Sequence, residues 1–276
     1  MNDNALDLAF VADKAVLDTA LSEANVFENQ NAAYSTVLGR EERVLNAETN
    51  ATETLDNMKL SPYDGGLLYE RVDYDKPFSI NYTVTPQNAG RVYVYTAYPD
   101  VNGAYELATA DMYVNGESVG QLGGVYDCGV KLLGSFGAGE SFTLTLCPKS
   151  NVFVCSDLMF YSEDSAALST AVADIRAEAP SAALEKLSSS HLRWTGSING
   201  DGKVLMLSVP YESAWRVYVD GERAKLHPAL GVLSAVELAP GEHTVELRYI
   251  PRGFYAGLAL TAVSILLFAR IYKKKR

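Results

Sequence analysis

The three histidines of this chain are its best candidates for acid–base or metal chemistry near neutral pH, but their spacing favours neither use. His191, His227 and His243 are far apart in the sequence, and each lies on or beside an expected strand. The sequence shows no Ser/His/Asp or Cys/His order with a recognisable elbow, and no H-E-x-x-H, P-loop or G-x-G-x-x-G motif. We therefore expect structural histidines, and no catalytic or cofactor-binding residue.

Acidic residues suggest two further kinds of chemistry. A close pair such as Glu41-Glu42 resembles a glycosidase dyad, but acidic neighbours are frequent in a chain with a formal net charge of −11. Asp100, Asn102 and Asp111 are candidate calcium ligands, although they lack the glycine and the terminal Glu of an EF-hand loop. We expect neither a dyad nor a metal site.

The cysteines Cys128, Cys147 and Cys155 lie close together in the sequence, without a C-x-x-C pair and without a histidine nearby. This spacing argues against metal binding. An odd number of cysteines permits one disulfide at most and leaves a free thiol. The sequence favours small buried cysteines but leaves the disulfide state open.

Tyrosine is abundant, with 17 residues, and several tyrosines alternate along an expected strand. Four of them, with Asp and Asn nearby, are candidates for a sugar-stacking face: Tyr93, Tyr95, Tyr98 and Tyr105. Tyrosine also fills the half-buried face of an ordinary β-sandwich, where its hydroxyl reaches a partner or water. The structural interpretation is favoured, and both remain open at this stage.

The C-terminus carries an apolar run from Phe254 to Phe268, followed by a cluster of cations. Its length as a helix matches the thickness of a bilayer core, so we expect a transmembrane helix over residues 253–272. A buried core helix is the alternative, but it does not explain the terminal cations. The expected membrane-anchor residues are Phe254, Leu258, Leu266, Phe268, Arg270, Lys273, Lys274, Lys275 and Arg276.

The basic tail at residues 273–276 predicts a cytoplasmic C-terminus and places the rest of the chain outside the cell. The acidic excess of the residues before 191 argues against nucleic acid as a partner. Met1-Asn2-Asp3-Asn4 has neither the basic nor the apolar region of a signal peptide. We therefore expect the C-terminal piece of a longer membrane protein whose earlier spans are missing here, with a tail-anchored protein as the alternative.

Alternating β-branched and aromatic residues predict short strands, for example at Ser79–Thr85, Arg91–Ala97 and Val152–Phe160. The expected fold is mainly β: two β-sandwich or jelly-roll-like domains joined by a helical connector and followed by one transmembrane helix. In the connector, Asp164 is expected to cap a helix that resumes after Pro180. The expected domains are 1–60 (mixed N-terminal segment continuing from the missing membrane part), 61–163 (first β-sandwich), 164–190 (helical connector), 191–252 (second β domain), 253–272 (transmembrane helix) and 273–276 (basic tail).

The two β domains look like repeats, because Tyr113–Glu117 (Y-V-N-G-E) recurs as Tyr218–Glu222 (Y-V-D-G-E). Asn-Gly and Asp-Gly both suit the positive φ angles of a type I′ hairpin. In each domain a Gly-Glu pair follows some 20 residues later and begins another strand. Two copies of one architecture are therefore expected.

The segment from Ser208 to Tyr249, with Pro251-Arg252-Gly253-Phe254 after it, resembles the C-terminal signature of bacterial YfhO-type membrane proteins. Phe27-Glu28-Asn29-Gln30-Asn31 matches near the start. Ala214 replaces the usual Gly, and Leu233 replaces a frequent Phe. The signature residues are Phe27, Asn29, Gln30, Asn31, Pro210, Tyr211, Trp215, Asp220, Gly221, Pro240, Gly241, His243, Tyr249, Pro251 and Gly253.

The resemblance implies a polytopic protein of the bacterial cell membrane with a GT-C-like, glycosyltransferase-type membrane part. It also implies a role in glycosylating cell-wall polymers such as lipoteichoic acid from a polyprenyl-linked sugar. The catalytic acid of GT-C enzymes lies in an early loop that this chain lacks, so the resemblance implies a non-catalytic accessory region without a cofactor. A membrane-anchored carbohydrate-binding or adhesion module is the second hypothesis. The lipid bilayer is an expected partner under both.

Overall fold

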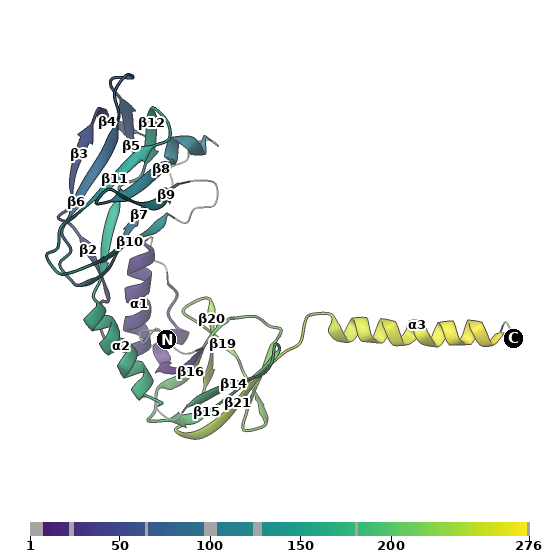
Figure 1. The fold of residues 1–276 in the computed structure, drawn as a ribbon. Helices are drawn as coiled ribbons and strands as arrows, with labels where there is room; N and C mark the ends of the chain where they lie inside the picture. The colour runs from purple at the N-terminus through teal and green to yellow at the C-terminus, as the bar shows by residue number, and fades with distance from the viewer. Residues whose placement is uncertain are drawn as a thin grey trace. The chain divides into compact units, whose positions relative to one another are not determined.

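The computed structural model describes residues 8–21, 25–63, 66–96, 104–123, 129–179 and 182–274. Over these residues the chain is mainly antiparallel β-sheet with a C-terminal helix, as the sequence predicts (Figure 1). The chain divides into two compact units, each described here by itself. Unit 1 comprises Met1–Ser22, Ala33–Glu41 and Ala171–Arg276, and unit 2 comprises Glu23–Ala32 and Glu42–Thr170.

Unit 2 contains three antiparallel sheets. The five-stranded sheet has the order β3 (Thr52–Asp56), β6 (Ser79–Val84), β11 (Phe142–Pro148), β8 (Ala110–Val114) and β9 (Glu117–Leu122). The four-stranded sheet has the order β10 (Val130–Phe136), β7 (Gly90–Tyr95), β13 (Met159–Glu163) and β2 (Leu45–Glu48). The three-stranded sheet has the order β12 (Val152–Cys155), β5 (Gly66–Arg71) and β4 (Met58–Tyr63), and a 3-10 helix, η2, spans Tyr105–Ala108.

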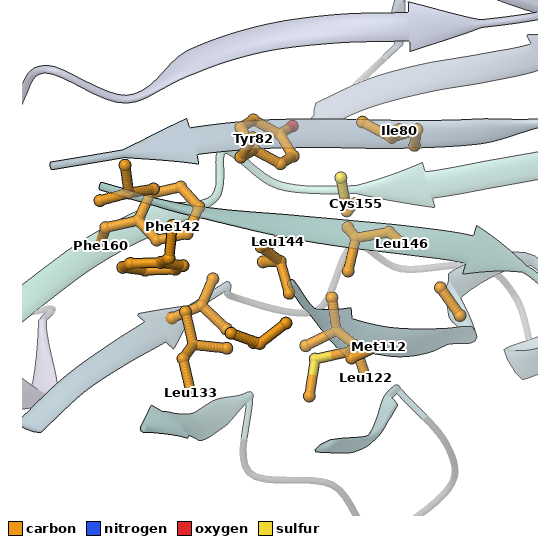
Figure 2. Packing of buried hydrophobic residues seen from close by; sticks show 14 of the residues in the cluster. Ile80, Tyr82, Met112, Leu122, Leu133, Phe142, Leu144, Leu146, Cys155 and Phe160 are labelled. Atoms are coloured by element: carbon orange, nitrogen blue, oxygen red, sulfur yellow. The ribbon is translucent and has the colours of Figure 1, made fainter. Parts of the chain in front are cut away.

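The core of unit 2 follows from alternation along its central strand, β11. Leu144 and Leu146 are fully buried, and Thr145 between them is only half-buried. Leu146 lies opposite Ile80 on one side and Met112 on the other, and all three side chains belong to one buried cluster (Figure 2). Burying a leucine side chain contributes about 1.5–3 kcal/mol, so this row of side chains is a main source of the unit's stability.

Unit 1 contains two antiparallel sheets. The five-stranded sheet has the order β14 (Ala183–Ser188), β15 (His191–Ile198), β21 (Gly241–Tyr249), β17 (Trp215–Val219) and β18 (Glu222–Ala224). The four-stranded sheet has the order β1 (Ala9–Asp13), β16 (Lys203–Pro210), β20 (Leu233–Glu237) and β19 (His227–Ala229), and the 3-10 helix η1 spans Lys14–Leu17.

Strand β16 is buried on both faces, and this explains its unbroken apolar run. Leu205 and Leu207 pack with Trp194 of the five-stranded sheet, which is fully buried. Val204 and Met206 point to the opposite face, where they share a cluster with helix residues that include Val37 and Ile175. The four-stranded sheet therefore lies between a second sheet and helical side chains within the same unit.

Three α-helices lie among the described residues: α1 (Val26–Leu38), α2 (Ser165–Ala177) and α3 (Phe254–Lys274). Helix α1 is followed by Gly39 at a φ of 66°, the left-handed conformation that glycine commonly adopts just after a helix. Helix α2 is capped by Asp164, whose Oδ1 accepts hydrogen bonds from the backbone N–H groups of Ala166 (3.1 Å) and Ala167 (2.9 Å). The expected cap is confirmed.

The structure differs from the sequence prediction after Pro180. Residues 183–188 form strand β14, not a resumed helix, so the prediction of a helical connector through residue 190 is wrong there. Leu184 lies opposite Trp194 of β15 and packs against the buried cluster. Pairing with β15 outweighs the local helix propensity of this stretch. The strand expected over 152–160 is also interrupted, and becomes β12 and β13.

The N-terminal 60 residues do not form a separate segment of their own. Strand β1 pairs with β16 in unit 1, with Ala9 opposite Leu207. Strands β2, β3 and β4 belong to the sheets of unit 2. The polar residues of β2 and β3 gave no strand signal in the sequence, because the pairing of these strands depends on partners far away in the chain.

The repeated architecture is visible in the sheet orders. In the five-stranded sheets, β3-β6-β11-β8-β9 of unit 2 corresponds to β14-β15-β21-β17-β18 of unit 1. In the four-stranded sheets, β10-β7-β13 corresponds to β20-β16-β1. Strand β1, from the N-terminus, thus takes the position in unit 1 that β13 takes in unit 2.

The two Y-V-N/D-G-E hairpins have nearly identical geometry. The φ angles are 50° and 86° at Asn115 and Gly116, and 51° and 86° at Asp220 and Gly221, which agrees with the expected type I′ turns. In both, the first turn residue binds the neighbouring strand through its side chain. The N–H of Thr143 donates to Asn115 Oδ1, and the N–H of Thr244 donates to Asp220 Oδ1, both at 2.9 Å.

Candidate functional site

The N-terminal signature motif anchors helix α1 to the sheet of unit 2 through aromatic packing. Phe27 is buried and stacks on Tyr161, with ring centroids 4.4 Å apart. Its ring also contacts Tyr93 and Tyr95, at centroid distances of 5.6 and 6.2 Å. Two of the tyrosines considered for sugar stacking therefore lie together on β7, with Phe27 against their rings. Tyr98 and the side chain of Tyr105 lie outside the described residues, so the proposed four-tyrosine face stays a prediction.

Asn31 holds the chain that leads into β2. It is 5% exposed, its Nδ2 donates to the carbonyl oxygen of Leu45 (2.8 Å), and its Oδ1 accepts from the N–H groups of Val44 and Leu45 (3.0 Å each). Three hydrogen bonds from one buried amide fix the path of this segment. Of the other signature residues here, Asn29 is half-buried and Gln30 is exposed.

A buried polar network lies between β3, β5 and β6. The hydroxyls of Tyr69 and Tyr82 both donate to Glu53 Oε1, at 2.6 and 2.7 Å, and lie 3.1 Å from each other. Burial raises the pKa of both phenols above the ordinary value, so both keep their protons. Cys155 is buried in the same unit, and burial raises the pKa of its thiol to about 12. The two phenols and the thiol therefore stay neutral and are poor nucleophiles at neutral pH.

Cys147 and Cys155 are free thiols, and Cys128 lies outside the described residues. In the parts of the chain that the structure describes, no group of three or more His, Cys, Asp or Glu side chains is placed to hold a metal ion. Asp111 forms an ion pair with Lys149, and the other two calcium candidates, Asp100 and Asn102, lie outside the described residues.

The histidines have carboxylate partners within unit 1. His191 Nε2 lies 3.1 Å from Glu246, and His227 Nε2 lies 3.6 Å from Glu237. His243 Nδ1 lies 2.7 Å from Asp220, and its Nε2 lies 2.9 Å from the carbonyl oxygen of Ala239. The hydrogen bond to Asp220 raises the pKa of His243 above its ordinary value. The backbone N–H of Thr244, together with His243, lowers the pKa of Asp220. His243 thus joins the Asp220-Gly221 hairpin to the loop before β21.

That loop contains Pro240, which is exposed, and it leads into Gly241, the first residue of β21, whose φ of 131° lies in a region that L side chains rarely adopt. The signature residues of this loop therefore set a backbone path that lets β21 begin beside the hairpin.

Signature residues also connect β17 to the segment before α3. Trp215 packs edge-on against Tyr249, with ring centroids 5.1 Å apart, and the Tyr249 hydroxyl donates to Glu212 (3.2 Å). Arg252 Nη2 donates to Ser213 Oγ at 2.5 Å. These contacts hold the end of β21, at the point where the chain continues toward α3. Pro210, Tyr211, Pro251 and Gly253 are exposed along the same stretch.

The outer face of the five-stranded sheet of unit 1 carries four arginines, which we call the arginine face: Arg193, Arg216, Arg223 and Arg248. Arg248 lies opposite His191 on one side and Arg216 on the other, so one row across three strands is cationic or titratable at every position. Glu246, one row further, binds Arg248 (2.6 Å), Arg193 (2.9 Å) and His191. Hydrogen bonds from Arg248 and Arg193 lower the pKa of Glu246 to about 2.

Two residues of the arginine face have no carboxylate within ion-pair distance among the described residues. These are Arg216, whose Cζ lies 5.4 Å from the centre of the Tyr255 ring, and Arg223. Both line an open groove of about 480 Å³ together with Lys225, Trp215 and Tyr211. This face was not predicted from the sequence. Each of the four strands carries one arginine next to an apolar residue, and only the strand register brings these arginines onto one face.

Helix α3 carries the expected anchor residues. Its side chains are exposed from Phe254 to Lys273, a stretch long and apolar enough to cross a membrane. Phe254, Leu258, Leu266 and Phe268 are among these exposed apolar side chains, and Arg270 and Lys273 lie near the end. The side chain of Lys274 and all of Lys275 and Arg276 lie outside the described residues.

Solved structures that resemble this chain at low sequence identity include two carbohydrate-binding proteins. A family 35 carbohydrate-binding module from Clostridium thermocellum has 16% sequence identity and a TM-score of 0.28, covering 43% of this chain and 95% of the module. The CBM32-1 and CBM32-2 domains of Clostridium perfringens ZmpB, in complex with GalNAc, have 10% identity and a TM-score of 0.32, covering 83% of this chain and 92% of theirs. Scores this low support no conclusion about activity. No curated protein matches the chain.

The family comparison is more direct. The model of the bacterial membrane protein YfhO family matches residues 1–261, a range that includes both signature regions and the first turns of α3. The resemblance inferred from Phe27–Asn31 and from the segment before α3 is thereby confirmed over nearly the whole chain. This protein therefore belongs to the YfhO family of bacterial membrane proteins.

Proposed function

We propose that this chain is an accessory, non-catalytic region of a YfhO-family membrane protein that glycosylates a cell-wall polymer such as lipoteichoic acid. In this proposal both β units lie outside the cell, α3 crosses the membrane, and the basic tail is cytoplasmic. A polytopic, GT-C-like membrane part would transfer sugar from a polyprenyl-linked donor to the polymer. The β units would cover that part and guide the acceptor.

The observation that carries the membrane placement is the exposure of α3. From Phe254 to Lys273 the helix presents its apolar side chains to the surroundings, without burial against the β units. Leaving such side chains in water is unfavourable, and a bilayer removes them from water at a length that fits its core. Family membership supports the same placement.

The accessory role is supported by what the titratable side chains contact. Asp220 and His243 bind each other at a hairpin, and the Tyr69 and Tyr82 hydroxyls are held by Glu53 in the core of unit 2. These contacts stabilise turns and sheets. In this proposal the sugar-transfer step accordingly belongs to a membrane-embedded part that lies earlier in the protein.

Two measurements on the intact protein test this proposal. In a bacterium that carries this gene, deleting the region for this chain should abolish sugar on lipoteichoic acid, measured by NMR of the purified polymer, and restoring the region should return it. The purified full chain in detergent should not turn over a polyprenyl-linked sugar. Unchanged polymer in the deletion strain would refute the role in glycosylation, and turnover by the chain alone would refute the accessory role.

Orientation needs its own test. Protease added to intact, wall-stripped cells should digest both β units, whereas a tag placed after Arg276 should be cut only after lysis. Protection of the β units in intact cells would reverse the proposed topology. The second hypothesis, a membrane-anchored carbohydrate-binding module, predicts instead that the full chain binds glycans on an array and that its deletion leaves polymer glycosylation unchanged.

A further inference from the structure

The arginine face presents more positive charge at the end of the sheet nearest α3 than the protein neutralises. Arg216 and Arg248 lie directly opposite each other on β17 and β21, with His191 on the far side of Arg248. Like charges directly opposite each other destabilise a sheet. Glu246 offsets Arg248 and Arg193, and the other carboxylate in these two rows is Glu185, opposite Arg193 on β14.

We propose that the arginine face is a docking surface for the phosphate headgroups of anionic lipids in the bilayer that α3 enters. The proposal rests on the proposed membrane insertion of α3. Arginine presents several N–H donors in a planar fork, which matches the oxygens of a phosphate group. A phosphate between Arg216 and Arg223 would provide the anionic partner that each of them lacks among the described side chains.

The connection to α3 places these arginines near the headgroups. Strand β21 ends at Tyr249 and α3 begins at Phe254, and an extended chain spans at most about 3.6 Å per residue. The guanidinium of Arg216 lies over the ring of Tyr255, in the first turn of α3. Arg252, just before the helix, binds Ser213. The face therefore cannot move far from the point where α3 would enter lipid.

The aromatic residues around the groove favour a bilayer over a soluble phosphate. Trp and Tyr concentrate at membrane interfaces, where a ring contacts acyl chains and its polar end stays hydrated. Trp215 and Tyr211 line the groove beside Arg216 and Arg223, and Tyr255 begins the helix. The chain as a whole has a formal net charge of −11 and would be repelled by an anionic surface. The arginine face gives unit 1 one positively charged surface that an anionic bilayer can attract despite the negative charge of the whole chain.

The test uses the full chain reconstituted in lipid nanodiscs, with nitroxide-labelled headgroups that quench tryptophan at short range. Trp194 is fully buried, so Trp215 supplies the variable signal, and Trp215→Phe measures the background. Quenching is expressed as the tryptophan fluorescence in each kind of labelled disc divided by the fluorescence in the same discs without nitroxide. Discs of phosphatidylglycerol mixed with phosphatidylcholine are compared with discs of phosphatidylcholine alone. Carbonate extraction of every variant reports separately whether α3 is inserted.

We expect stronger quenching of Trp215 in the anionic discs, and loss of the difference in about 1 M NaCl, where charges are screened beyond about 3 Å. Each arginine near an anionic surface raises the equilibrium constant for docking about fivefold. The double substitution Arg216→Gln and Arg223→Gln should therefore lower that constant about 30-fold. Arg216→Lys should retain part of it. Neither glutamine substitution removes an ion pair among the described residues of unit 1. The control pair Lys59→Gln and Lys76→Gln removes the same charge from unit 2 and should have no effect.

Equal quenching in both kinds of disc, with α3 inserted, would overturn the docking proposal and leave the membrane proposal intact. Extraction of the wild-type chain by carbonate would overturn both. The last measurement adds inorganic phosphate or soluble polyphosphate as a competitor for the arginine face. If millimolar phosphate abolishes the anionic-lipid effect, or if polyphosphate binds the chain while phosphatidylglycerol does not, the surface serves a soluble phosphate or an anionic polymer and the lipid assignment is wrong.

Discussion

Replacing Asn31 with alanine should loosen the start of β2 far more than its small change in volume suggests. The substitution removes three hydrogen bonds at once and leaves two N–H groups, of Val44 and Leu45, and one carbonyl without their partner. Val44 and Leu45 are themselves buried, so water cannot readily replace the amide. At about 1 kcal/mol for each lost bond, the expected local destabilisation is about 3 kcal/mol.

Hydrogen exchange followed by mass spectrometry measures this effect directly. Because about 1.4 kcal/mol corresponds to a factor of ten, amides in the peptide containing Val44 and Leu45 should exchange about 100-fold faster in Asn31→Ala. Gln30→Ala is the matched control. It alters the neighbouring signature residue on the same helix, but Gln30 is exposed, so exchange at β2 should be unchanged.

The result that would refute this reasoning is equal protection of the β2 peptide in Asn31→Ala and wild type. Equal loss of protection in Gln30→Ala would refute it too, because the effect would then belong to helix α1 in general and not to the buried amide.

Three further predictions concern unit 1 and α3. Asp220→Asn keeps the oxygen that binds Thr244 but loses the charge beside His243. Since the folded pKa of His243 is raised and that of Asp220 is lowered, the wild-type advantage in melting temperature should be full between about pH 4 and pH 6.5, and it should vanish as the pH rises through the folded pKa of His243. Glu246 has a folded pKa of about 2, so the contribution of its carboxylate to the free energy of unfolding is present above about pH 4.5 and is lost as the pH falls toward 2. Acid titration followed by circular dichroism should show this loss of stability in wild type and not in Glu246→Gln. Val263→Arg, near the middle of α3, should cost about 3 kcal/mol of insertion and release the chain on carbonate extraction, whereas Ala262→Leu should stay bound.

Local signals in the sequence predicted local structure well. Asp164 caps α2, and the Asn-Gly and Asp-Gly pairs form the expected turns. Each of these depends on hydrogen bonds or φ angles within a few residues, so the information lies in the segment itself. The exposed apolar helix at the C-terminus was predictable for the same reason.

Long-range pairing was not predictable in this way. Residues 183–188 have the composition of a helix but pair with β15 as a strand, and the polar stretches of β2 and β3 gave no strand signal. The arginine face depends on a register that places Arg248 beside Arg216, and a shift of one residue would turn one of these side chains toward the core. Such features require the paired strands to be known first.

The route of strand β1 has a consequence for how the protein is made. Ala9 pairs with Leu207, so this strand leaves the ribosome about 200 residues before its partner, a delay of roughly 10–40 s at bacterial synthesis rates of about 5–20 residues per second. Most of unit 2 is synthesised during that interval and can complete its sheets first. Throughout this time Phe10 and Val11, buried in the finished protein, have no sheet to join. Nascent chains should therefore need a holding chaperone until β16 emerges, and unit 1 should reach its native state only near the end of translation.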